Sequence, residues 1–127
     1  MRLPTRIHGI LDYLMGALLI ASPWLFGFAD HQAARWVPVG LGAGVLLYSL
    51  LTDYEVGAVR KIQMPVHLML DALGGILLAA SPWVLGFDER VWMPHVVVGI
   101  AYLIISLLTR STPDSATVTQ TTHRTTA

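Results

Sequence analysis

Four apolar stretches fill most of residues 1–110, and each is long enough to cross a lipid bilayer as a helix. A spanning helix needs about 20 apolar residues, with a working range of roughly 17 to 25. The predicted spans are residues 7–28, 36–52, 64–87 and 91–108. Each should be α-helical, because a segment inside the bilayer must satisfy its own backbone hydrogen bonds. The sequence therefore predicts an all-α membrane protein with four transmembrane helices.

Composition and charge agree with this assignment. With 54% hydrophobic and 13% charged residues, the chain is too apolar for an ordinary soluble domain of 127 residues. Eight Lys and Arg residues balance eight Asp and Glu residues, so nothing suggests a nucleic-acid partner. The chain has no cysteine, which excludes disulfides, thiolate metal sites and cysteine nucleophiles. The expected partner is the lipid bilayer itself.

The basic residues predict the orientation. Six of them lie on the side that both termini share and only two on the other side, which places both termini in the cytoplasm. The first group is Arg2, Arg6, Arg60, Lys61, Arg110 and Arg124, and the second is Arg35 and Arg90. Four tryptophans mark the far ends of the spans, where an indole ring prefers the headgroup region. These are Trp24, Trp36, Trp83 and Trp92.

The chain contains an internal duplication. Residues 8–28 and 67–87 align without a gap and are identical at 13 of 21 positions. The match continues from Ser49-Leu50-Leu51-Thr52 to Ser106-Leu107-Leu108-Thr109. The repeating unit is thus a helical hairpin, with repeat one at about 5–55 and repeat two at about 64–110. Because each unit crosses twice, both copies enter the membrane in the same direction, and their pseudo-twofold axis should follow the membrane normal.

Each hairpin carries a Ser-Pro-Trp triplet near the end of its first span, at Ser22-Pro23-Trp24 and Ser81-Pro82-Trp83. Two such hairpins resemble the SPW repeat family of small prokaryotic membrane proteins. That resemblance implies a multi-pass protein of the prokaryotic plasma (inner) membrane, with no established activity and no catalytic residues to transfer. The residues themselves indicate a structural corner, since proline interrupts the helical ladder and serine can bond to freed backbone groups.

A polar stripe repeats as well. His8, Asp12 and Gly16 are spaced at i, i+4 and i+8, so they share one helical face. The second copy of the stripe is His67, Asp71 and Gly75. Ionisable residues within a span are costly and usually face the bundle interior. The parallel symmetry would bring both His-Asp pairs together at the cytoplasmic end, with Asp53 and Glu55 nearby.

Three interpretations of this cluster stay open. It can join the hairpins structurally, with each Asp holding its own His and basic residues such as Arg6, Arg60, Lys61 or Arg110 neutralising the rest. It can bind a ligand, either haem through two axial histidines or a divalent metal with help from Asp53 and Glu55. It can belong to a proton or small-solute pathway, although the outer half shows no continuous polar path. Of the other histidines, His95 is expected at the membrane interface and His123 in solvent.

Further expectations concern packing and the ends of the domain. Gly40 and Gly44 have the GxxxG spacing that permits close helix contact, within the bundle or with a second copy in a homo-oligomer. The linker at 52–61 could be a short interfacial helix with Tyr54 at headgroup level. Residues 111–127 read as a disordered, Thr-rich cytoplasmic tail. No catalytic or nucleotide-binding motif is present, so we expect a non-enzymatic structural or interaction bundle, with a haem or metal protein as the alternative.

Overall fold

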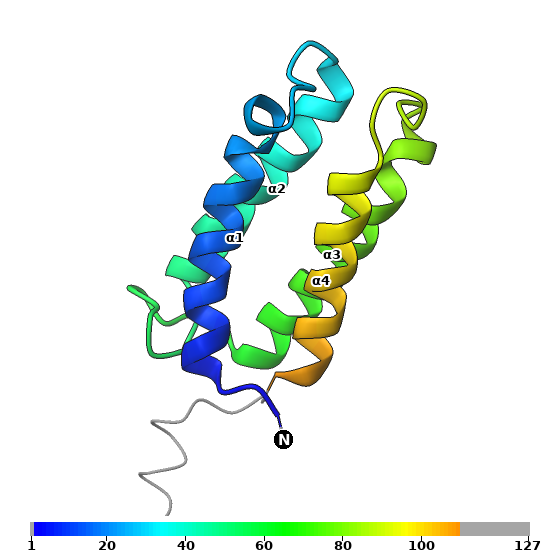
Figure 1. The fold of residues 1–127 in the computed structure, drawn as a ribbon. Coiled ribbons are helices and arrows are strands. Elements are labelled where there is room, and N and C mark those ends of the chain that lie inside the picture. The colour runs from blue at the N-terminus through cyan, green and yellow to red at the C-terminus, as the bar shows by residue number, and fades with distance from the viewer. Residues whose placement is uncertain (1, 110–127) are drawn as a thin grey trace, which may run out of the picture.

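The computed structural model describes residues 2–109, which form two helical hairpins that lie side by side (Figure 1). The first hairpin is α1 (Thr5–Leu25) and α2 (Gln32–Leu50), and the second is α3 (Met64–Val84) and α4 (Met93–Leu108). Within the described residues there is no strand, only two isolated bridges, Leu3 to Thr109 and Thr52 to Ile62. The prediction of an all-α fold with two tandem hairpins is confirmed.

Three of the helices are long and apolar enough to cross a membrane, namely α1, α2 and α3. Helix α4 is also apolar but has only 16 residues. At 1.5 Å per residue it is about 24 Å long, somewhat less than the roughly 30 Å of a hydrocarbon core. The helices thus suit a multi-pass membrane protein, with α4 as the short member.

In each Ser-Pro pair, the serine replaces the helical hydrogen bond that the proline removes. Pro23 has no N–H, so the carbonyl of Leu19, four residues earlier, loses its helical partner. The Ser22 hydroxyl donates to that same carbonyl at 2.8 Å. In the second repeat Ser81 donates to Leu78 at 2.7 Å, again four residues before the proline. Serine therefore precedes proline because it satisfies the acceptor that proline leaves free, and the helix continues for two more residues.

The corner after the proline is formed by a glycine. Gly27 and Gly86 have φ angles of 74° and 72°, the left-handed conformation that ends many helices and that glycine adopts without strain. The structural corner predicted for each Ser-Pro-Trp motif is present, and glycine completes it. The two tryptophans of the motif point outwards, with Trp24 62% and Trp83 55% exposed, as expected for side chains that contact lipid headgroups.

Each hairpin packs through one pair of glycines. A Cβ placed on Gly42 would lie 2.6 Å from the carbonyl oxygen of Gly16, so only glycine fits there. The second repeat has the same contact between Gly99 and Gly75, at 2.5 Å. Gly40 and Gly44, by contrast, have open space where a Cβ would be. The predicted GxxxG pair thus does not pack within the chain, and Gly42 between them makes the close contact.

The linker differs from its prediction. Residues 51–63 contain turns and no helix, because backbone bonds such as Asp53 N–H to Ile62 O at 2.7 Å fold the segment back on itself. Tyr54 is fully buried beneath the bundle, so its ring is not exposed to lipid. At the same end, Leu3 N–H donates to Leu108 O at 2.7 Å, so both ends of the described chain meet there. The predicted tail at 111–127, with His123, lies outside the described residues.

At the opposite end of the bundle, His95 joins the two hairpins, and its side chain is buried inside the protein. Pro38 leaves the Ala34 carbonyl of α2 without a helical donor, and His95 Nε2–H of α4 donates to it at 3.1 Å. The imidazole lies between the rings of Phe28 and Phe87, with centroids 5.0 and 4.9 Å away. The hydrogen bond to Ala34 and the contacts with two phenylalanine rings explain why this histidine is buried, although it lies near the start of a helix.

Candidate metal centre

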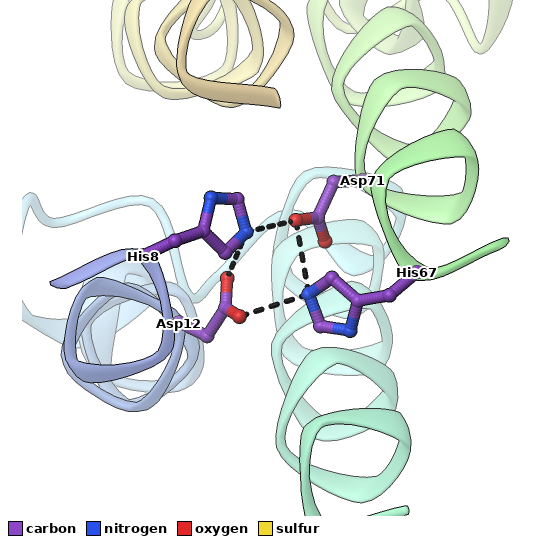
Figure 2. A group of neighbouring side chains, drawn as sticks. All are labelled: His8, Asp12, His67 and Asp71. Atoms are coloured by element: carbon purple, nitrogen blue, oxygen red, sulfur yellow. Dashed lines mark hydrogen bonds and ion pairs between the residues drawn. The ribbon is translucent and has the colours of Figure 1, made fainter. Parts of the chain in front are cut away.

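Four ionisable side chains meet between α1 and α3, and we call them the tetrad: His8, Asp12, His67 and Asp71. Figure 2 shows His8 and Asp12 reaching from one helix and His67 and Asp71 from the other, all pointing toward a common centre. Each pair is spaced i, i+4 on its own helix, which places both side chains on one face. The structure therefore brings together the two His-Asp pairs as the pseudo-twofold symmetry predicted.

The contacts within the tetrad are short and involve only one nitrogen of each imidazole. His8 Nε2 lies 3.2 Å from Asp12 Oδ1 and 2.7 Å from Asp71 Oδ2. His67 Nε2 lies 2.9 Å from Asp12 Oδ2 and 3.2 Å from Asp71 Oδ2. All four residues are between 0% and 2% exposed. Two carboxylates so deeply buried require positive charge close by.

The second nitrogen of each imidazole is fixed by a threonine from the other repeat. His8 Nδ1 lies 2.7 Å from Thr109 Oγ1, and His67 Nδ1 lies 2.7 Å from Thr52 Oγ1. Both hydroxyl protons are already used, because Thr109 donates to Ile105 O and Thr52 donates to Tyr48 O, each at 2.6 Å. A hydroxyl that donates elsewhere can only accept from the imidazole. The Nδ1 atoms therefore carry hydrogens and donate to the threonines.

This tautomer has a direct consequence for the centre. With the hydrogen on Nδ1, the Nε2 of a neutral imidazole presents a lone pair to carboxylate oxygens, which are themselves acceptors. His67 Nε2 makes no aligned hydrogen bond with any described residue despite its 2.9 Å approach to Asp12. Such an arrangement needs a cation between nitrogen and oxygen. Either two protons or one divalent metal ion would bring the tetrad to zero net charge.

Two tyrosines supply the remaining hydrogen bonds to the carboxylates. The Tyr54 hydroxyl donates to Asp12 Oδ2 at 3.0 Å, and the Tyr48 hydroxyl donates to Asp71 Oδ1. Burial and the neighbouring Asp12 carboxylate raise the pKa of the Tyr54 phenol above its ordinary value. Tyr54 thus stays protonated and remains a donor at neutral pH. With these bonds, each carboxylate keeps an oxygen directed at the Nε2 atoms.

The geometry of the tetrad suits a small ion. One ligand atom from each residue can be chosen so that all four lie within 4.8 Å of one another. A tetrahedral zinc site has metal–ligand distances of about 2.0–2.1 Å, which places its ligand atoms about 3.3 Å apart. The four Nε2–Oδ contacts of 2.7–3.2 Å are only a few tenths of an ångström shorter. To match such a site, the four short contacts would lengthen and the longest separation, 4.8 Å, would shorten.

The structure does not bring the other predicted ligands into the tetrad. Asp53 has an exposed side chain, because its backbone is held in the linker. Both carboxylate oxygens of Glu55 lie 2.9 Å from the Thr5 hydroxyl, which donates to them. Within residues 2–109, no ion pair joins Arg6, Arg60 or Lys61 to the tetrad, and Arg110 lies outside that range.

Sequence reasoning missed the residues that support the tetrad. Thr52 and Thr109 are equivalent positions of the duplication, which was the one available sign that they matter. The two tyrosines had no such sign, since position 105, the counterpart of Tyr48, is Ile105, and Tyr54 lies in the linker. The role of Tyr54 depends on how the linker folds beneath the bundle, and that of Tyr48 on how α2 packs against α3.

Comparison with known proteins agrees with the duplication. A family model described as the SPW repeat domain matches residues 6–109, which include both hairpins and the whole tetrad. Neither the comparison with curated proteins nor that with solved structures finds a match. The chain belongs to the SPW repeat family.

Proposed function

We propose that this protein is a non-enzymatic, multi-pass protein of the prokaryotic inner membrane in which one buried divalent metal ion joins the two repeats. The observation that carries the proposal is the orientation of the imidazoles. Both histidines donate through Nδ1 to threonine, and both Nε2 atoms are directed at carboxylate oxygens, where each can carry a proton or ligate a metal ion. A ligating histidine normally has such a partner on its second nitrogen, which fixes the ring and its tautomer.

The donor set favours a particular class of ion. Two imidazole nitrogens and two carboxylate oxygens are hard to intermediate ligands, and a compact four-ligand site is typical of Zn²⁺. The two negative charges of Asp12 and Asp71 match a divalent ion. The whole centre would then be neutral, which keeps its burial between membrane-spanning helices tolerable.

Haem suits the site less well than a single ion. A porphyrin ligated by His8 and His67 would have to lie between their Nε2 atoms. Asp12 and Asp71 already occupy that space, within 2.7–3.2 Å of the same nitrogens. An ion fits between these four groups without displacing any of them.

A static centre is also favoured over a proton or solute pathway. Toward the outer end the tetrad is followed by an apolar core formed by Leu19, Val45, Leu78 and the ring of Tyr102. A pathway would need polar groups or water along this stretch. We further propose that both termini lie in the cytoplasm, because Leu3 and Leu108 meet at one end and six of the eight basic residues belong to that side. The tetrad would then lie in the cytoplasmic half of the membrane.

Metal loading of the purified protein tests the proposal. Protein in mild detergent is stripped with a chelator, loaded with Zn²⁺ or Co²⁺ and freed of excess metal. We expect one ion per chain, and with Co²⁺ the visible absorption of a tetrahedral complex. The variant His8→Gln/His67→Gln should lose both signals. The matched control His95→Gln, which changes a buried histidine at the other end, should keep them.

The other outcomes are equally informative. A parent protein that binds no metal, yet is more stable than the double variant, would mean that two protons occupy the tetrad and that its role is structural. Equal loading of the parent and the double variant would place the metal elsewhere in the chain. Either result contradicts the proposed metal centre.

A further inference from the structure

A cleft runs between α2 and α3, and neither hairpin fills it. Its inner part has a volume of about 340 Å³ and extends from Tyr48 and Asp71 past Gly44 and Gly74. A second cavity of about 410 Å³ shares Gly40, Leu41 and Leu77 with the first and continues toward the outer end. A Cβ on any of the three glycines would meet nothing within 4 Å. The cleft is therefore elongated, and its size lies in the range of small-molecule sites, roughly 300–1,000 Å³.

One polar group of the cleft has no partner. Tyr102 of α4 lines the inner part, is 5% exposed, and its hydroxyl makes no hydrogen bond with any described residue. A buried hydroxyl without a hydrogen-bond partner is unfavourable by about 1–3 kcal/mol, so a bound ligand that accepts its hydrogen would remove this cost. Tyr102 thus adds an unpaired hydroxyl to the lining of this inner part, whose other polar side chains are those of Tyr48 and Asp71.

The lining excludes several kinds of occupant. The lining of the cleft contains no Lys or Arg, and its one charged residue is Asp71. The carboxylate of Asp71 would repel the negative charge of a phosphate headgroup. The polar end lies within the spans, whereas a phospholipid keeps its headgroup at the surface. Leu73 and Leu77, which are 52% and 64% exposed, border the cleft on the side that faces lipid. An occupant would thus enter from the bilayer.

We propose that this cleft binds an uncharged, lipid-soluble molecule with a carbonyl-bearing head and a long apolar chain, the chemical class of the isoprenoid quinones. The carbonyl accepts a hydrogen bond from the Tyr102 hydroxyl. The chain lies along Gly44, Gly74 and Gly40 toward the outer end. The site does not depend on the metal centre, since the donor and the apolar lining belong to the cleft itself.

Binding of decylubiquinone to the detergent-solubilised protein tests this site, with decylbenzene as the probe that lacks carbonyls. We expect saturable binding and a higher melting temperature with decylubiquinone only. Tyr102→Phe should weaken binding roughly two- to tenfold, the effect of one neutral hydrogen bond. The melting temperature of this variant without ligand should not fall, because the hydroxyl has no internal partner to lose.

A second pair of variants tests the chain-binding part. Gly44→Leu/Gly74→Leu fills the cleft and should abolish binding, whereas Ala17→Leu adds apolar bulk on an exposed face of α1 and should leave it unchanged. Equal effects of the two probes on the parent would overturn the proposal. A parent that is a dimer, becomes monomeric in the cleft-filling variant and binds neither probe would show that a second copy occupies the Gly40/Gly44 face.

Discussion

The hydrogen bond between Thr52 and His67 allows a sharp test of the tautomer argument. Thr52→Val keeps the shape of the side chain but removes the only acceptor that the structure gives to His67 Nδ1–H. The Tyr48 carbonyl also loses the hydrogen bond from the threonine hydroxyl, but it still accepts one from Leu51 N–H at 3.2 Å. The substitution therefore acts mainly on the imidazole, whose donor is left buried and unpaired.

The expected magnitude follows from that unpaired donor. A buried N–H without a partner lowers the free energy of unfolding by about 1–3 kcal/mol. Loss of the group that orients a ligating histidine typically weakens metal binding by about 10- to 100-fold. If the proton of His67 moves to Nε2 instead, the loss of stability is smaller, but the proton then competes with a metal ion for that nitrogen. Both effects act in the same direction, toward weaker metal binding.

Competition with a chelating dye measures the Zn²⁺ affinity, and thermal unfolding in detergent measures stability. Thr52→Ser is the matched control, because it keeps the hydroxyl and should behave like the parent. Thr109→Val should repeat the loss, since the pseudo-twofold axis relates its contact with His8 to that of Thr52. If Thr52→Val and Thr52→Ser bind Zn²⁺ equally and unfold at the same temperature, the assignment of the Nδ1 hydrogens is refuted.

Three further predictions concern the scaffold. Ser81→Ala leaves the carbonyl freed by the proline without a donor and should lower unfolding free energy by about 1–3 kcal/mol in detergent. Gly42→Ala should lower the free energy of unfolding by about 1–3 kcal/mol, because the added methyl group overpacks the contact with Gly16. In the same assay, Gly40→Ala should be neutral or mildly stabilising. The Arg90 guanidinium, 2.7 Å away, holds the pKa of Asp30 below its ordinary value, so the bond persists at neutral pH and weakens as acid protonates Asp30. Arg90→Gln should therefore return the pKa of Asp30, followed by NMR titration, toward about 3.9.

The duplication explains why so much of the site could be predicted. Once two spans are known to be equivalent and parallel, His8 and His67 must lie at equal depth, and so must Asp12 and Asp71. Helical spacing then places all four on inward faces. Neither step requires any knowledge of how the loops fold, and the tetrad is correspondingly the part of the site that was anticipated.

Apart from Thr52 and Thr109, the features that could not be predicted depend on the non-equivalent parts of the chain. The linker has no counterpart in the second repeat, and its backbone bonds carry Tyr54 under the bundle while leaving Asp53 exposed. His95 was assigned to the interface because it follows Pro94 at a helix start. Its burial results from an acceptor that Pro38 frees on another helix, a contact that local sequence cannot reveal.

The crossed contacts of the tetrad also bear on assembly. Each histidine relies on a threonine that belongs to the other hairpin, so a lone hairpin has half of the donors and half of the acceptors. A chain with one repeat could complete the arrangement only by pairing with an identical copy, in a step that depends on protein concentration. Joining two hairpins through a short linker makes that step intramolecular, at an effective concentration in the millimolar range. A low-abundance protein can then form the centre as reliably as an abundant one.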